Sequence, residues 1–271
     1  MDHNEFFTFE TGELSDVGCR RSINEDSLLA RPDCGLWVVS DGMGGHTAGD
    51  FASQAIVGEL ETIGHAASPE DLEARFMERI VRANETIVAH AAELDRGTIG
   101  ATLVALLVNG DDFACAWSGD SRAYLLRDGH FNQQTRDHTE VRDLLDAGAI
   151  TPEEAANWPR KNVITRAIGV ADLPSVDIVT GKLKLDDTFV LCSDGLTEHL
   201  ADEEIAQFAS TLPPREACAA MVQETLDRGA RDNVTVIAIR CLPAPPPEDD
   251  DDMPADDMLG VAHTLTETTE P

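Results

Sequence analysis

The sequence has few basic residues. Lys and Arg together number 20 against 51 Asp and Glu, which gives a formal net charge of −31. A chain this acidic repels nucleic-acid phosphates and anionic lipid headgroups, so we expect neither nucleic acid nor a membrane surface as a partner. Cations match this charge better, and metal ions are the simplest of them.

Other signals are missing as well. No uninterrupted apolar stretch approaches the ~20 residues of a membrane span, and the acidic N-terminus has no basic and apolar leader. The six cysteines form no C-x-x-C pair and no zinc-finger spacing, and several lie in apolar runs such as FVLC. Because 271 residues can bury a sizeable core, we expect a cytoplasmic protein that folds without disulfides or a structural metal.

The composition changes after Cys241. The segment 242–271 is rich in proline and contains nine acidic residues but no Lys or Arg. Little in it could form a core, so we predict a disordered acidic tail behind a single domain spanning 6–241.

Within the domain, strand-like and helix-like stretches alternate. Short apolar or β-branched runs bounded by Gly, Asp or Asn predict strands over 36–41, 102–108, 113–129, 187–194 and 233–241. Helical spacing of apolar residues predicts helices over 48–63, 69–94, 202–210 and 214–228, with Ser68 as N-cap of the second. Two helices close together early in the chain, and strands joined by tight turns, favour a layered α+β domain.

Several acidic residues stand where a strand-like run ends. Asp41 follows LWVVS, Asp194 follows FVLCS, and Asp232 comes just before VTVIAIR. A single Asp-Gly is an ordinary turn signal, but a carboxylate beside a buried strand end is costly unless a cation or donor compensates it. The repetition therefore favours a site for hard ions such as Mg²⁺ or Mn²⁺.

Six short motifs follow one another along the chain: Arg21-x-x-Asn24-Glu25-Asp26, Asp41-Gly-Met-Gly-Gly45, Gly119-Asp120-Ser121-Arg122-Ala123-Tyr124, Thr165-Arg166-Ala167-Ile168-Gly169, Ser193-Asp194-Gly195-Leu196 and Arg231-Asp232-Asn233. In this order they resemble the metal-dependent protein phosphatases, the type-2C family, in its compact bacterial form. The resemblance implies a four-layer αββα sandwich, two antiparallel sheets flanked by helices. It also implies a bacterial phosphatase that removes phosphate from serine or threonine on proteins and opposes a kinase.

The resemblance implies a set of metal ligands. Asp41 would bridge two Mn²⁺ or Mg²⁺ ions, with help from the carbonyl of Gly42. Asp194 and Asp232 would be terminal ligands of one ion. Asp120 matches the position that acts with Asp194 on a third, weaker ion in bacterial members.

The resemblance also implies roles around the reacting phosphate. Arg21 would grip the phosphate, for which a guanidinium fork suits better than an ammonium group. Glu25 would hold its ion largely through water, and Asp26 would hydrogen-bond metal-bound water. Ser193 and Asn233 match supporting positions. The implied reaction is direct attack on phosphorus by water that the two ions activate, without a phosphoenzyme.

Other chemistries lack their sequence signals. No cysteine is followed by arginine at the Cys-x5-Arg spacing, and no phosphate-binding glycine loop is present, so neither a cysteine phosphatase nor ATP use is expected. One alternative is a catalytically idle member that binds phosphoproteins as an adaptor, which the complete set of Arg21, Asp41, Asp194 and Asp232 disfavours. Another is an acidic cation-binding protein, but the D-x-[DN]-x-[DN]-G ladder is absent.

The chain departs from eukaryotic relatives at Met43, which stands where they have a histidine; His46 is a candidate proton donor in its place. His138 is expected to be structural. The segment 140–165 matches a flap near the site, where Trp158 and Lys161 are candidates for substrate contact. We expect a monomer.

Overall fold

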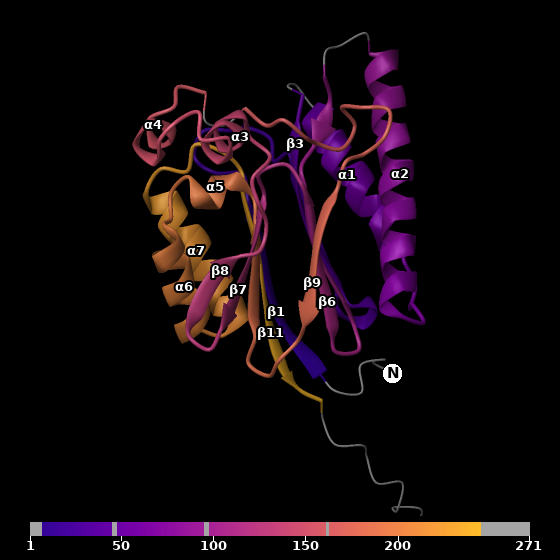
Figure 1. Ribbon diagram of the computed structural model, residues 1–271, viewed down its shortest axis with the longest axis vertical. Coiled ribbons are helices and arrows are strands. Elements are labelled where there is room, and N and C mark those ends of the chain that lie inside the picture. Colours follow the sequence, from indigo (N-terminus) through magenta and orange to yellow (C-terminus); the bar gives the residue numbers. More distant parts are fainter. Residues whose placement is uncertain (1–6, 45–47, 95–97, 161–162, 245–271) are drawn as a thin grey trace, which may run out of the picture.

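The computed structural model describes residues 7–44, 48–94, 98–160 and 163–244, and it arranges them in four layers (Figure 1). Two antiparallel sheets lie in the middle. Helices α1 (Ala48–Glu61) and α2 (Pro69–Glu93) cover one sheet, and α6 (Asp202–Thr211) and α7 (Pro214–Asp227) cover the other. The implied αββα sandwich is confirmed.

Each sheet combines strands from distant parts of the chain. The first has the order β1-β11-β10-β7-β8, formed by Phe7–Asp16, Val234–Pro243, Thr188–Cys192, Arg122–Arg127 and His130–Gln133. The second has the order β2-β3-β5-β6-β9, formed by Asp26–Arg31, Leu36–Met43, Leu103–Asn109, Asp112–Ser118 and Asp177–Lys182. The short β4 (Gly100–Ala101) pairs with the end of β3. The first and last strands, β1 and β11, are partners along their whole length.

Three apolar layers hold the sandwich together. Trp37 and Val39 of β3 pack between the sheets, whereas Leu36 and Val38 of the same strand face α1 and α2. Successive side chains of a strand point to opposite faces, so a strand covered on both faces reads as a continuous apolar run. A third layer joins α6 and α7 to β7, β10 and β11, with Met221 at its centre. Five of the six cysteines are buried in the structure.

The four long helices lie where the apolar spacing predicts them. The backbone N–H of Asp71 donates to Ser68 Oγ at 3.2 Å, so Ser68 caps α2 as expected. The prediction of a single strand over 113–129 was wrong. It forms β6 and β7, which belong to different sheets, because the chain crosses between the sheets at Gly119–Ser121.

Short helices lie at one end of the sandwich, at the top of Figure 1: α3 (Glu140–Asp146), α4 (Pro152–Ala156) and α5 (Asp194–Thr197). A 3-10 turn (Pro32–Cys34) joins β2 to β3. Strand β11 includes Leu242 and Pro243, and the predicted disordered tail lies outside the described residues from 245 onward. Within the described ranges, no helix combines the length and apolarity needed to cross a membrane.

Candidate active site

One sheet brings three of the sequence-predicted carboxylates to the same end. Asp26 at the start of β2 lies directly opposite Asp41 near the end of β3. Glu25 precedes Asp26, and its carbonyl accepts the backbone N–H of Gly42 at 3.2 Å. The antiparallel pairing of β2 with β3 therefore gathers residues from two separate motifs.

The other sheet, which contains β10 and β11, supplies Asp194 and Asp232 at the same end. Asp194 is the first residue of α5, directly after β10, and Asp232 stands just before β11. The N–H of Ser193 donates to the carbonyl of Thr235 at 3.0 Å, so the ends of these neighbouring strands are held together. Burial and the negative charges of nearby Asp120 and Glu198 raise the pKa of Asp194 well above its usual range.

Asp26 links the two sheets. Its Oδ2 accepts hydrogen bonds from Ser193 Oγ at 2.8 Å and from Thr235 Oγ1 at 2.7 Å, whereas its Oδ1 is buried without a partner. Burial is the main cause that raises the pKa of Asp26 to about 6, and the two hydroxyl donors oppose this shift. Thr235 was not predicted as a site residue, because a threonine in an apolar strand carries no sequence signal.

Asn233 holds the backbone beside Glu25. Its Oδ1 accepts the N–H of Glu25 at 2.9 Å, and its Nδ2 donates to the carbonyls of Val17 and Ile23. Together with the Ser193 hydroxyl on Asp26, this places both residues expected to play supporting roles in contact with the acidic cluster.

Arg21 lies at the open side of the cluster. Its Nη2 donates to Asp232 Oδ2 at 2.7 Å, and its Nη1 is 3.9 Å from Glu25 Oε2. The hydrogen bond to Asp232 is the largest cause that raises the pKa of Arg21. The Arg21 side chain remains 48% exposed, so it is accessible to a ligand that approaches the carboxylates.

Asp120 sits on the crossover between the sheets. Gly119 has φ +115°, and a Cβ there would lie 2.7 Å from a side-chain carbon of Thr102, so glycine is required. His138 holds this turn in place: its Nδ1 accepts the backbone N–H of Gly119 at 3.1 Å, and its backbone N–H donates to the Gly119 carbonyl at 2.9 Å. Burial, with repulsion from Asp137, raises the pKa of Asp120 to about 7.

Thr102 connects this turn to Asp41. Its Oγ1 accepts the backbone N–H of Asp41 at 3.0 Å and lies 2.6 Å from Ser121 Oγ. Burial raises the pKa of Asp41 well above its usual range, and Asp26, Asp194 and Asp120 add to that shift by repulsion. Thr102 was not predicted as a site residue, since it lies outside the six motifs.

The donor set fits divalent cations. The clustered carboxylates offer only oxygen atoms as ligands, and Mg²⁺ and Mn²⁺ prefer oxygen. Two of these oxygens, Glu25 Oε1 and Asp26 Oδ1, are buried and have no hydrogen-bond partner. A Cβ on Gly49 would come within 2.5 Å of Glu25 Oε1, so glycine keeps this space open. Among the described residues no three His, Cys, Asp or Glu side chains close around one point.

The flap region lies beside the cluster as α3 and α4. A bridge between Thr139 and Ile164 closes its base. Trp158 is half-buried, and its backbone N–H donates to the carbonyl of Ala155. Lys161 and His46, two further candidates from the sequence, lie outside the described residues.

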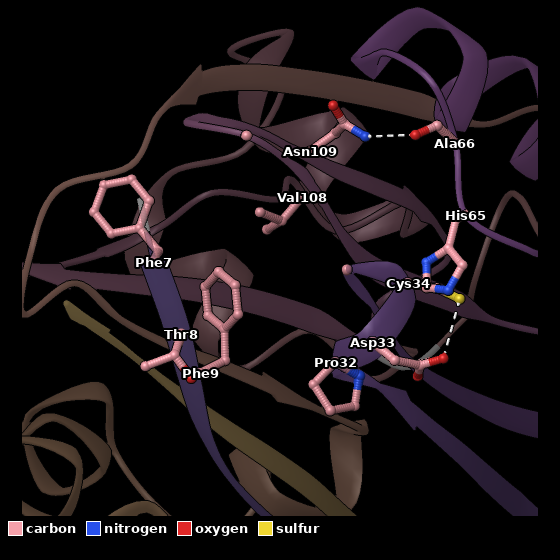
Figure 2. Close-up of a pocket in the computed structure, with 12 residues that line it drawn as sticks. Phe7, Thr8, Phe9, Pro32, Asp33, Cys34, His65, Ala66, Val108 and Asn109 are labelled. Carbon is pink, nitrogen blue, oxygen red and sulfur yellow. Dashed lines mark hydrogen bonds between the residues drawn. The ribbon is translucent and has the colours of Figure 1, made fainter. Parts of the chain in front are cut away.

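A separate cavity of about 230 Å³ lies at the other end of the sheets (Figure 2). Phe7 and Phe9 of β1, Cys34 and His65 are among the residues that line it. It contains none of the predicted site residues, and the Cys34 thiol donates to Asp33 Oδ2 at 3.3 Å. The candidate site is therefore the carboxylate cluster and not this cavity.

Comparison with known families gives a match over residues 20–231 to the model described as protein phosphatase 2C. The chain belongs to this family. It is 37% identical over 225 residues to the serine/threonine protein phosphatase PstP of Mycobacterium tuberculosis, covering 82% of this chain and 43% of that protein. It therefore spans less than half the length of this phosphatase 2C relative.

One further relative, and the solved catalytic domain of PstP itself, match over most of their length. The serine/threonine phosphatase Stp of Listeria monocytogenes is 37% identical over 248 residues, which cover 88% of this chain and 95% of that protein. The solved catalytic domain of PstP in complex with two manganese ions has a TM-score of 0.79 and 34% identity, covering 87% of this chain and 99% of that one.

Proposed function

We propose that this chain is a Mn²⁺- or Mg²⁺-dependent protein phosphatase that hydrolyses phosphoserine and phosphothreonine on proteins. The observation that carries the proposal is the meeting of Asp26 and Asp41 from one sheet with Asp194 from the other, beside the exposed side chain of Arg21. Membership of the phosphatase 2C family and the two manganese ions in the PstP domain support it.

We assign the metal-binding roles as the motifs imply. Asp41 would bridge two ions with help from the Gly42 carbonyl, Asp194 and Asp232 would be terminal ligands of one ion, and Glu25 would act through water. Asp120 with Asp194 would hold a third, weaker ion. When bound, such ions activate water as Lewis acids and neutralise the phosphate charge.

The chain's own groups complete the chemistry. Arg21 would exchange its hydrogen bond to Asp232 for the phosphate, which it can meet with two parallel N–H groups. Asp26 would accept a proton from the attacking water at Oδ1, the oxygen that Ser193 and Thr235 leave free. A carboxylate with a pKa of about 6 is suited to this transfer near neutral pH.

We further propose that the protein works in a bacterial cytoplasm as a monomer and opposes a serine/threonine kinase. The absence of a membrane-crossing helix from the described residues is compatible with this location. Its substrates would then be the phosphoproteins that the kinase produces.

The decisive experiment measures hydrolysis of a phosphothreonine peptide with Mn²⁺, with EDTA, and with Mn²⁺ on Asp194→Asn protein. We expect turnover that requires Mn²⁺ and falls by at least ~100-fold in the variant. Asp112→Asn, which changes a carboxylate on β6 paired with Lys182, serves as the matched control and should keep full activity. Mn²⁺ binding by calorimetry without any turnover would favour the idle adaptor instead, and turnover that survives both EDTA and the substitution would refute the proposal.

A further inference from the structure

Two arginines beside the site have side chains without a partner. Among the described residues, the Lys and Arg side chains have hydrogen-bond or ion-pair partners with three exceptions, Arg20, Arg215 and Arg231. All three residues are exposed. In a chain with 51 acidic residues against 20 basic ones, an arginine without a carboxylate partner is unexpected. Two of the three directly precede or follow residues that we place at the site, since Arg20 precedes Arg21 and Arg231 precedes Asp232.

The backbone brings Arg20 and Arg231 together. The N–H of Cys19 donates to the carbonyl of Ala230 at 2.8 Å, and these two residues directly precede the two arginines. Successive Cα atoms are about 3.8 Å apart, so the Cα atoms of the two arginines lie at most about 15 Å from each other. Two long arginine side chains at this separation can contact one ligand that lies between them.

The two backbone segments that carry these arginines are fixed to each other. Gly18 has φ +76°, and a Cβ there would lie 2.1 Å from the carbonyl oxygen of Asp232, so glycine is required for this close approach. The Nδ2 of Asn233 donates to the carbonyls of Val17 and Ile23 at 2.9 and 3.0 Å. A site formed in advance costs less ordering when a ligand binds.

The two arginines flank the pair of residues that we place at the phosphate. Arg21 follows Arg20, and its Nη2 donates at 2.7 Å to Asp232, which follows Arg231. Metal ions bound by the carboxylates would add positive charge here and would not cancel that of the arginines. An extended peptide advances about 3.4 Å per residue, so side chains within a few positions of the phosphorylated residue can reach Arg20 or Arg231.

A neighbouring arginine shows that acids are within reach of this part of the chain. Arg228, three residues before Arg231, donates from Nε to Glu224 at 2.9 Å and from Nη2 to Glu204 at 2.6 Å. Its Nη1 donates to the carbonyl of His199. The exposed guanidinium of Arg231 has no comparable partner among the described residues. Its charge is therefore available to an anion from outside the chain.

We propose that Arg20 and Arg231 bind a second anionic side chain of the phosphoprotein substrate, close in sequence to the phosphorylated residue. The ligand is a carboxylate or a further phosphate, and a guanidinium can meet either group with two parallel N–H donors. The inference rests on the proposed phosphatase function and adds a substrate class to it: phosphoserine or phosphothreonine in an acidic or multiply phosphorylated segment.

The test compares phosphothreonine peptides that differ at one position. Glutamate, its uncharged analogue glutamine, or a non-hydrolysable phosphonate analogue of phosphoserine is placed in turn at each of the four positions on either side, and kcat/KM is measured with Mn²⁺. At one position we expect glutamate to exceed glutamine about three- to tenfold and the phosphonate to exceed it by more. A gain with only one of the two anions assigns the site to that anion. At positions that do not reach the arginines, the acidic chain should give glutamate no advantage.

Substitutions locate the preference. Arg20→Gln and Arg231→Gln should each lower the ratio of glutamate to glutamine, and the double variant should bring it close to one. Arg215→Gln is the matched control, because this third unpaired arginine lies at the start of α7 whereas Arg231 follows the end of that helix. It should leave the ratio unchanged. The combined change of Arg20→Glu and Arg231→Glu should reverse the preference and favour a peptide with lysine at the same position.

The outcomes separate the two proposals. Hydrolysis of p-nitrophenyl phosphate, which has no flanking residue, normalises each variant and reports separately on the proposed function. Equal rates for glutamate and glutamine at every position would overturn the assignment of the two arginines even with an active phosphatase. A preference that the double variant retains, or that Arg215→Gln lowers equally, would overturn it as well.

Binding of labelled peptides tests the same preference without turnover. Fluorescence anisotropy compares the glutamate and glutamine peptides on the wild-type chain and on the double variant, with the phosphothreonine replaced by its phosphonate. A chain that hydrolyses neither peptide nor p-nitrophenyl phosphate but still prefers the glutamate peptide through Arg20 and Arg231 would keep this site and lose the proposed function.

Discussion

Buried carboxylates at the two ends of the sandwich differ in whether a basic side chain is paired with them. Asp187, 1% exposed at the end remote from the site, accepts Nε of Arg127 at 2.7 Å and the N–H of Lys184 at 2.7 Å. At the site end, Asp41 and Asp194 have raised pKa values, and burial is the main cause for both. No arginine or lysine is paired with either of them among the described residues. A buried carboxylate that is paired with an arginine of the same chain contributes to the stability of the fold. A buried carboxylate without such a partner lowers stability and remains available to bind a cationic ligand.

The largest effect should follow from removal of the compensating cation at the remote end. Arg127→Met leaves the carboxylate of Asp187 buried and unpaired, so we expect the free energy of unfolding to fall by about 3–5 kcal/mol. Urea unfolding in EDTA measures this loss of stability. In a separate assay, the activity per folded molecule should be unchanged. A loss below about 1 kcal/mol would show that Asp187 does not depend on Arg127.

A substitution at the site end should change the free energy of unfolding in the opposite direction. Asp194→Asn removes one of several repelling charges, so the metal-free protein should gain about 2 kcal/mol at pH 8 although it loses activity. Asp187→Asn is the matched control and should lose stability. If both variants are destabilised in EDTA, the contrast between the two ends is wrong.

The metal-free protein should also lose stability as the pH rises. The folded pKa values of Asp26 and Asp120, about 6 and 7, lie above the usual value near 4. Their contribution is complete below pH 4 and is lost progressively as the pH rises from 4 through the folded values of about 6 and 7, so the metal-free protein should be less stable at pH 8 than at pH 5. His138, whose pKa burial lowers, acts in the opposite direction.

Thermal unfolding between pH 5 and pH 8 measures this dependence. Asp194→Asn protein, which retains His138, should show a shallower loss. Mn²⁺ should raise the melting temperature more at pH 8 than at pH 5, and an equal rise at both would contradict the assignment of these acids to an ion.

The smallest change in the free energy of unfolding is expected when an ion pair of the same geometry is broken at an exposed position. Arg31 donates from Nε and Nη2 to both oxygens of Asp33 at 2.9 and 2.7 Å, as Arg127 does to Asp187, but the Asp33 side chain is 47% exposed. Asp33→Asn should therefore cost only about 0.5 kcal/mol by urea unfolding. A cost equal to that of Arg127→Met would mean that burial does not set the difference.

The sequence predicted the helices better than the strands. Helical periodicity located α2 within a residue at its end, because its apolar face is continuous and Ser68 marks its start. Strands β1, β2 and β9 were not predicted, since β1 carries three acidic residues and all three are largely half-buried. Their identity depends on pairing with partners distant in the sequence, which local composition does not encode.

The sequence likewise predicted only some of the residues of the site. The motifs named the carboxylates and Arg21, and the structure brings them to one end of the two sheets. The hydroxyls of Thr102 and Thr235, which bond to Asp41 and Asp26, were missed. Their role arises from the register of neighbouring strands, and threonine in a strand is otherwise common.

The pairing of β1 with β11 joins residues 7–16 to residues 234–243, the two ends of the described chain. During synthesis, Glu25 and Asp41 leave the ribosome long before Asp194 and Asp232. The last strand is also the one beside which Asp232 stands and from which Thr235 reaches Asp26. A chain truncated before β11 therefore cannot assemble the cluster, because Asp232 and Thr235 come with that strand.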